Sequence, residues 1–315
     1  MWRQAVVMAL VMATYAAPAV AKRPKPVAKH APPVARRPPA ADGGWDYLID
    51  KLAADGIDRA RAAAIFRDPR VGDFEGLQFS LGRREARAMY RGFLRPPSIA
   101  AARRCRADYD DAFRAAEDRF DVPASVVSAL LHVETHCGRN TGTSVVFGRL
   151  ARLAMANEPD NVADNIQRHS KGVPRALTPQ VERQVRQRAR ELEGVFYPEV
   201  VAMFRIADQA GIDPLTIRGS GSGAFGLPQF LPSSYLRFGV DGNGDGRVSL
   251  YDPDDAIASA ANYLARHGWR PGITRDQQRQ VIWTYNHSDP YIDTVLILAG
   301  RIEESQPSRR SLAER

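Results

Sequence analysis

The 315-residue chain is poor in cysteine and in the valine-rich alternating segments that are typical of half-buried β-strands. Its only two cysteines, Cys105 and Cys137, allow at most one intramolecular disulfide. In an exported protein they can form that bridge, and they can equally be two separate buried thiols, so the sequence leaves both open. No internal repeat is present, which argues against a repeat architecture.

Acidic residues are absent from residues 1–40, and this absence explains most of the net charge of +8. Seven cationic side chains lie there, so residues 41–315 carry a net charge of only +1. No basic motif of the nucleic-acid-binding kind lies in this nearly neutral part, and the basic composition therefore does not indicate nucleic-acid binding.

The N-terminus has the pattern of a secretory signal peptide, residues 1–21. An apolar stretch follows Arg3 and ends at the small-residue site Ala19-Val20-Ala21. Because Pro18 and several small residues interrupt the stretch, we expect cleavage after Ala21 and no transmembrane segment in the mature protein. No cysteine follows that site, so no lipid anchor is expected there. The predicted location is periplasmic or secreted.

Residues 22–43, rich in Pro, Ala, Lys and Arg, are predicted to form an extended linker, and residues 305–315 a polar tail. Residues 44–304 form the predicted folded domain, which is mainly α-helical. The segment 157–177 is polar and is predicted to be a long surface loop. The predicted helices cover residues 45–54, 58–66, 83–91, 98–120, 123–137, 145–156, 179–193, 199–210, 254–267, 275–285 and 290–303.

One carboxylate lies on the apolar face of a predicted helix. Glu134 follows Leu130 and Leu131 at helical spacing, close to the C-terminal end of that helix. Burial and the negative end of the helix dipole both favour the protonated carboxyl, which a general acid for glycoside cleavage requires. The alternative is a structural buried glutamate paired with His136 or Arg139.

The segment 218–234 is rich in glycine and serine but also carries Phe225 and Phe230, which suits an ordered functional loop. It is not a phosphate-binding loop, because no lysine follows the glycines and no strand is predicted before them. The two aromatic rings can stack on sugars or belong to the core.

Residues 241–252 have the spacing of an EF-hand loop, which predicts a structural Ca²⁺ site. The alternative is an Asp/Asn/Gly turn in which the last aspartate caps the next helix. The predicted oxygen ligands are Asp241, Asn243, Asp245, the carbonyl of Arg247, and Asp252.

Three segments, in this order along the chain, match motifs of one known family. Residues 133–139, Val-Glu-Thr-His-Cys-Gly-Arg, resemble a Val-Glu-Thr-x-x-Gly-Arg motif. Residues 219–235 resemble a Gly-Ser and Gly-Gln-Phe-Met-Pro-Ser-Ser-Tyr segment, and residues 285–288, Tyr-Asn-His-Ser, resemble a C-terminal Tyr-Asn motif. With these three motifs the chain resembles the membrane-bound lytic murein transglycosylase B family (glycoside hydrolase family 103, lysozyme-like).

The resemblance implies a lysozyme-like catalytic domain that cleaves the MurNAc-β-1,4-GlcNAc bond of peptidoglycan glycan strands and leaves 1,6-anhydro ends. It implies that Glu134 is the single acid/base. It also implies that Ser220 and Gln229 line the cleft, that Tyr285 and Asn286 face the glutamate, and that a similar calcium loop is present.

Two other functions stay open on the sequence: a lysozyme-like hydrolase that uses Glu134 and water, and a non-catalytic peptidoglycan-binding module. The chain also departs from the family pattern in four places. Cys137 replaces a common tryptophan, and Leu227-Pro228 replaces a Tyr-Gly pair. The segment 272–280 is short, so the β lobe is predicted to be small or absent, and the segment 157–193 is longer than usual.

Overall fold

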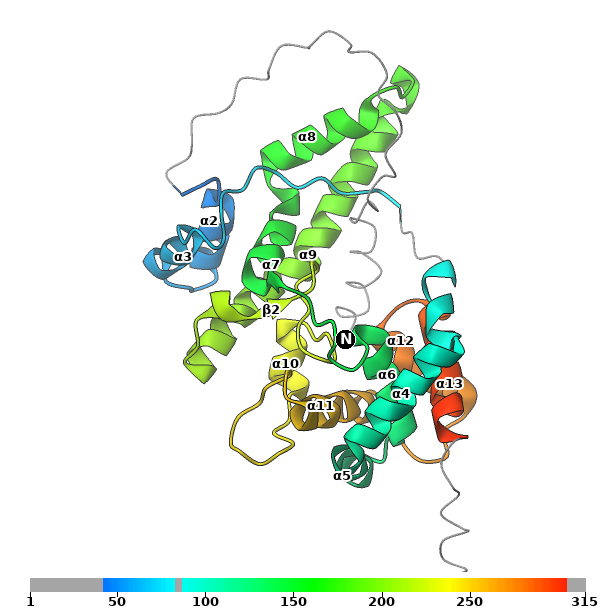
Figure 1. The fold of residues 1–315 in the computed structure, drawn as a ribbon. Coiled ribbons are helices and arrows are strands. Elements are labelled where there is room, and N and C mark those ends of the chain that lie inside the picture. The colour runs from blue at the N-terminus through cyan, green and yellow to red at the C-terminus, as the bar shows by residue number, and fades with distance from the viewer. Residues whose placement is uncertain (1–41, 83–86, 305–315) are drawn as a thin grey trace, which may run out of the picture.

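The computed structural model describes residues 42–82 and 87–304, and these ranges contain twelve α-helices (Figure 1). The predicted mainly α-helical fold is confirmed. The predicted signal peptide, most of the linker and the C-terminal tail lie outside the described residues. The helices are α2 (Asp46–Ala54), α3 (Arg59–Phe66), α4 (Pro96–Asp108), α5 (Asp110–Phe120), α6 (Ala124–Thr135), α7 (Val146–Ala154), α8 (Pro159–Ser170), α9 (Thr178–Ala210), α10 (Pro232–Phe238), α11 (Pro253–Arg266), α12 (Arg275–Tyr285) and α13 (Asp289–Glu303).

The remaining regular structure consists of short elements. Two strands, β1 (Ser144–Val145) and β2 (Arg218–Gly219), pair in antiparallel orientation, and within the described residues they are the only sheet. The prediction of a small or absent β lobe agrees with this. The 3₁₀ helices are η1 (Arg87–Met89), η2 (Arg91–Leu94), η3 (Met155–Asn157), η4 (Arg175–Leu177) and η5 (Pro214–Thr216).

Helix α6 lies inside a bundle formed with α4, α5, α11 and α13. All its residues from Ala124 to Val133 are buried, so the helix is enclosed on all sides and has no solvent-facing polar side. A helix surrounded in this way has little freedom to move, and it therefore holds the side chains of its last turn in fixed positions.

Helix α9 is a single helix of 33 residues, on which α7, α8 and α10 pack. The sequence predicted two helices separated near Pro198, and that prediction was wrong. Proline removes one backbone hydrogen bond and crowds the carbonyl four residues earlier, which here belongs to Gly194. The buried face continues through the proline from Phe196 to Val200 and Met203, and this packing keeps the helix intact.

Helix α8 lies in the segment that was predicted to be a polar loop, and that prediction was also wrong. Its buried side chains include Asn161 and Asn165, which are 3% and 2% exposed. The Oδ1 atoms of these asparagines accept the backbone N–H groups of Leu77 (2.7 Å) and Phe79 (3.3 Å). The helix is polar because its inner face binds the backbone of an extended segment, which hydrophobic periodicity cannot reveal.

Three other boundaries differ from the predictions. The predicted helix 98–120 is divided at Tyr109 into α4 and α5, and α10 was not predicted. The predicted helix 83–91 is represented by the 3₁₀ turn η1, while residues 83–86 lie outside the described part. None of the described helices combines the length and the apolar character that crossing a bilayer requires.

Candidate active site

Glu134 lies in the last turn of α6, where the helix approaches the start of α13. Its carboxylate oxygen Oε1 accepts a hydrogen bond of 2.6 Å from the hydroxyl of Tyr291, a residue of α13 that is fully buried. Burial and the charge of Glu134 raise the pKa of Tyr291 well above its ordinary value, so the hydroxyl stays protonated and donates. The sequence did not identify Tyr291, which lies 157 residues after Glu134.

Tyr285 and Asn286, predicted to face the glutamate, lie at the C-terminal end of α12. Burial raises the pKa of Tyr285 well above its ordinary value, and the nearby carboxylate of Glu134 adds to this rise. The hydroxyl of Tyr285 donates to the backbone carbonyl of Pro228, so its ring fixes the glycine-rich loop beside the glutamate. The side chain of Asn286 is fully buried, and its amide makes no hydrogen bond with any described residue.

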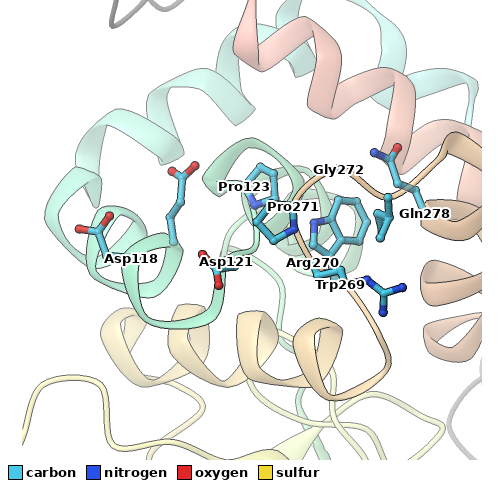
Figure 2. A pocket seen from close by; sticks show the side chains of 10 residues that line it. Asp118, Asp121, Pro123, Trp269, Arg270, Pro271, Gly272 and Gln278 are labelled. Atoms are coloured by element: carbon cyan, nitrogen blue, oxygen red, sulfur yellow. The ribbon is translucent and has the colours of Figure 1, made fainter.

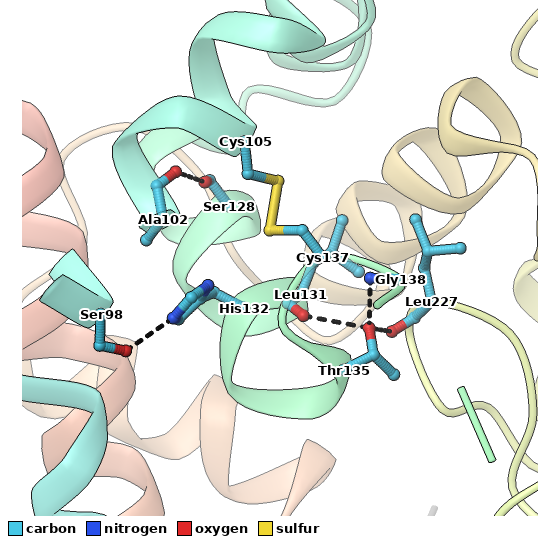
Figure 3. Close-up of a disulfide and its surroundings, with 10 residues drawn as sticks. All are labelled: Ser98, Ala102, Cys105, Ser128, Leu131, His132, Thr135, Cys137, Gly138 and Leu227. Carbon is cyan, nitrogen blue, oxygen red and sulfur yellow. Dashed lines mark hydrogen bonds between the residues drawn. A yellow bond between two sulfur atoms is a disulfide. The ribbon is translucent and has the colours of Figure 1, made fainter. Parts of the chain in front are cut away.

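A turn with left-handed backbone geometry follows Glu134 and is fixed on two sides (Figure 3). The φ angles of His136, Cys137 and Gly138 are 52°, 57° and 83°. Cys137 forms a disulfide with Cys105 of α4, with the two Cα atoms 6.3 Å apart. Thr135 Oγ1 donates to the carbonyl of Leu227 (2.9 Å) and accepts the N–H of Gly138 (2.9 Å). Of the two states that the sequence left open for the cysteines, the structure has the disulfide.

Ser220 and Gln229, predicted to line the cleft, lie in the loop between β2 and α10. Gln229 has a φ of 49°, rare for a residue other than glycine, and its Nε2 donates to the carbonyls of Gly226 (2.9 Å) and Thr141 (3.1 Å). Ser220 Oγ lies 2.8 Å from Ser222 Oγ. The loop is therefore ordered by its own polar side chains.

The segment after α6 approaches this loop so closely that only glycine fits. A Cβ on Gly142 would lie 2.2 Å from the carbonyl oxygen of Gly219, which itself has no room for a side chain. Phe225 and Phe230 are 3% and 0% exposed, so they belong to the core and do not offer their faces to a sugar.

A cavity of about 450 Å³ lies at the other end of α6 (Figure 2). Pro123, the N-cap residue of α6, lines it, together with Asp121 and Trp269. Glu134 is eleven residues further along the helix, roughly 16 Å away at 1.5 Å per residue. This cavity is therefore separate from the site around Glu134.

The predicted metal loop curls around its first aspartate. The two carboxylate oxygens of Asp241 accept the N–H groups of Gly244 (2.6 Å) and Gly246 (2.8 Å). Asn243 and Asp245 likewise accept backbone N–H groups two residues ahead, at 3.0 Å and 2.8 Å. The first three predicted side-chain ligands are thus folded towards the loop's own amides, as in an EF-hand loop.

The end of the loop follows the alternative interpretation. Asp252 Oδ1 accepts the N–H of Asp254 (2.9 Å) and caps α11. The buried Asp255 accepts the N–H groups of Gly242 (2.8 Å) and Ser249 (2.6 Å) instead. In the part of the chain that the structure describes, no group of three or more His, Cys, Asp or Glu side chains is arranged to hold a metal ion.

Comparison with known families identifies the family to which the residues around Glu134 belong. The family model described as Transglycosylase SLT domain matches residues 42–278, which include the helix of Glu134 and the glycine-rich loop. The chain belongs to the transglycosylase SLT domain family. The match ends within α12, before Tyr285 and Tyr291.

Individual relatives of this SLT-domain chain agree with the assignment. Membrane-bound lytic murein transglycosylase B of Escherichia coli is 34% identical over 164 residues, which are 52% of this chain and 37% of that protein. The chain therefore spans little more than a third of that relative. Two solved structures, both 23% identical, share the fold with TM-scores of 0.62: Escherichia coli Slt35 with bulgecin A, covering 84% of this chain and 94% of that one, and Pseudomonas aeruginosa SltB1, covering 83% and 98%.

We expect Tyr291→Phe to lower kcat by about 10- to 100-fold with little change in KM, because a hydrogen bond to a charged group contributes roughly 1.5–3 kcal/mol. Turnover of purified peptidoglycan measures the effect. Tyr197→Phe is the matched control, because Tyr197 is also a buried tyrosine that donates to a carboxylate, Asp55, at 2.7 Å. Equal activity losses in the two variants would contradict a specific role for Tyr291.

We expect His132, two residues before Glu134, to make the stability of the SLT domain pH-dependent. It is 1% exposed, its Nε2 lies 2.8 Å from Ser98 Oγ, and burial with the charges of His136 and Arg139 lowers its pKa to about 4. The folded-state pKa is below the unfolded value of about 6.5. The stability that neutral His132 contributes to the folded state is therefore complete above pH 6.5 and is lost as the pH falls towards 4.

Between pH 7 and pH 5 we expect the folded state to lose about 2 kcal/mol through His132. Urea unfolding at the two pH values measures this loss in the free energy of unfolding. The variant His132→Gln has no side chain that titrates there, so its loss between pH 7 and pH 5 should be smaller than that of the wild type by about 2 kcal/mol. Identical losses in wild type and variant would show that other groups carry the pH dependence.

Proposed function

We propose that this protein is a lytic transglycosylase that cleaves the MurNAc-β-1,4-GlcNAc bond of peptidoglycan and leaves a 1,6-anhydro-MurNAc end. The observation that carries the proposal is the half-buried Glu134, held by the 2.6 Å hydrogen bond from Tyr291 at the end of an enclosed helix. Membership of the SLT family supports the same activity.

In this reaction one carboxyl group acts twice. Protonated Glu134 gives its proton to the glycosidic oxygen as the bond from that oxygen to muramic acid C1 breaks. The resulting carboxylate then takes the proton of the muramic acid 6-hydroxyl, whose oxygen forms the new bond to C1. No water is consumed, and the enzyme returns to its protonated starting state.

The surrounding groups suit this double role. Tyr291 orients the carboxylate, and Tyr285 fixes the loop that carries Gln229 and Ser220. We assign Ser220 and Gln229 to the walls around the sugar, and Tyr285 and Asn286 to positions that face the glutamate. A relative with a similar fold, Pseudomonas aeruginosa SltB3 (20% identical, TM-score 0.58, 82% of this chain and 78% of that one), has been solved with NAG-anhNAM-pentapeptide, which supports a glycan substrate.

Digestion of purified sacculi tests the proposal. We expect soluble muropeptides whose new ends are one water lighter than hydrolysis products by mass spectrometry. Products of full hydrolytic mass would favour a lysozyme-like muramidase instead, and binding without release would favour a peptidoglycan-binding module. We propose a periplasmic or secreted location, in keeping with the predicted signal peptide and with this substrate.

We also propose that the loop 241–252 binds Ca²⁺ as a structural ion, with Asp241, Asn243, Asp245 and the Arg247 carbonyl as ligands. The first three side chains are folded towards the loop's own amides, which supports the site. Asp252 was also predicted to be a ligand, but in the structure it caps α11 instead. Slt35 of Escherichia coli (23% identical, TM-score 0.58, 84% of this chain and 94% of that one) has been solved with calcium.

Calcium at about tenfold above its Kd should then raise the melting temperature by about 3 °C, because binding to the folded state alone adds roughly 1.4 kcal/mol. Differential scanning fluorimetry with and without Ca²⁺ measures the shift. Asp241→Asn should lose the response and magnesium should not produce it. A melting temperature indifferent to millimolar Ca²⁺ would remove the metal assignment without affecting the role of Glu134.

A further inference from the structure

The segment that joins α8 to α9, together with the adjoining helix ends, is rich in positive charge. Residues 165–190 contain seven Arg and Lys side chains and one acid, a net charge of +6. Residues 41–315 together carry only +1, so the rest of that range carries −5. The positive charge is therefore gathered at the joined ends of the two helices, and other acids of these helices, among them Asp160, Asp164, Glu191 and Glu193, lie further from those ends.

The joined ends of these helices project beyond the other helices (Figure 1). Lys171, Arg175, Arg183 and Arg190 are exposed, and within the described residues none of the four has an acidic side chain at salt-bridge distance. The single acid of the segment, Glu182, pairs with Arg186 at 2.8 Å. The cations at the tip are thus available to an external anion.

The same tip also exposes apolar surface. Leu177, the last residue of η4, is 49% exposed, and the neighbouring Pro174 and Ala176 are exposed as well. An apolar side chain among unpaired cations has no favourable contact with a hydrophilic polyanion. At the interface of a bilayer such a side chain does have a favourable contact, because the cations bind the headgroups while a leucine enters the acyl boundary.

We propose that the tip of the α8–α9 hairpin, defined by Lys171, Arg175, Leu177 and Arg183, docks on the surface of an anionic phospholipid bilayer. The headgroup phosphates neutralise the cations, and Leu177 inserts between the headgroups. The negatively charged remainder of the fold is repelled by the same surface, so the protein is oriented with only the tip of the hairpin in contact with the bilayer. This contact is separate from the chemistry at Glu134.

Co-sedimentation of the full chain with vesicles tests the proposal, using phosphatidylglycerol/phosphatidylcholine vesicles beside pure phosphatidylcholine. The wild type should bind the anionic vesicles, and the triple variant Lys171→Gln, Arg175→Gln, Arg183→Gln should bind about 100-fold more weakly. Leu177→Ser, which changes no charge, should bind about tenfold more weakly. Peptidoglycan turnover in solution should stay at the wild-type level in all of these variants.

The matched control removes three other exposed arginines, with Arg205→Gln, Arg266→Gln and Arg275→Gln. It has the same net charge as the triple variant and keeps the basic residues 22–37, so non-specific attraction is equal in both. Equal vesicle binding by the two triple variants would overturn the proposal. A second result would also overturn it: the variant Lys171→Gln, Arg175→Gln, Arg183→Gln loses binding to sacculi, while Leu177→Ser binds vesicles as the wild type does. That result would favour an anionic wall polymer as the partner.

Discussion

Glu134→Gln should lower the release of soluble muropeptides by at least about 10³-fold while leaving the protein folded. Glutamine keeps the shape of the side chain and can still accept the hydrogen bond of Tyr291. It can neither give a proton to the glycosidic oxygen nor take one from the 6-hydroxyl, so both steps of the proposed reaction fail. Initial rates on purified sacculi, with wild type and variant prepared in parallel, measure the loss.

The chain contains a close control for this substitution. Glu193 of α9 is also a buried glutamate that accepts a hydrogen bond from a tyrosine, Tyr47, at 2.6 Å. It lies in the helix group of α9 and not in the bundle around α6. We expect Glu193→Gln to reduce stability and to change kcat by less than about threefold. A Glu134→Gln protein that still releases muropeptides at more than a few per cent of the wild-type rate would assign the chemistry to another group.

Removal of the disulfide should have the largest effect on stability. Cys105 and Cys137 are separated by 32 residues, and closing a loop of that length restricts the unfolded chain by about 3–4 kcal/mol. The double variant Cys105→Ala, Cys137→Ala should therefore melt about 10 °C lower, as scanning calorimetry can measure. Because the bridge also fixes the turn after Glu134, activity should fall more steeply with temperature than in the wild type.

Reductant provides the control within the same experiment. Dithiothreitol should lower the melting temperature of the wild type to that of the double variant and should not change the variant. A wild type whose melting temperature is the same with and without reductant would show that the bridge does not contribute to stability.

The position of Glu134 was predictable because the evidence for it is local. The apolar spacing of Leu130, Leu131 and Glu134 places the carboxyl on a buried helix face, and the structure has that helix. The partner that orients it was not predictable in this way. Tyr291 comes from a helix 157 residues later, and its hydroxyl reaches Glu134 only through the packing of α13 on α6.

The two misassigned helical regions have a common physical origin. In α8 the inner face is occupied by asparagines that bind backbone amides, so polarity does not indicate exposure. In α9 the helix passes through Pro198 because tertiary packing outweighs one missing hydrogen bond. Local propensity identified neither case, since both are decided by contacts with distant segments.

In the predicted metal loop, residues 241–252, the local spacing alone does not determine the role of each side chain. Its spacing predicts a Ca²⁺ site that stays a prediction; in the structure the loop folds around Asp241, and Asp252 can satisfy either the loop or the next helix. In the structure it caps α11. The choice depends on the competing role of Asp255, whose burial the sequence pattern does not contain.

In the proposed reaction a single carboxyl, Glu134, moves both protons, and the muramic acid 6-oxygen bonds to C1 without the use of water. Digestion of sacculi in oxygen-18-labelled water, followed by mass spectrometry of the new muramic acid ends, tests it most directly. We predict anhydro ends that carry no label, formed by the wild type and absent with Glu134→Gln. One labelled oxygen at each new end, formed by the wild type and lost with Glu134→Gln, would show that the same residue activates water and that the reaction is a hydrolysis.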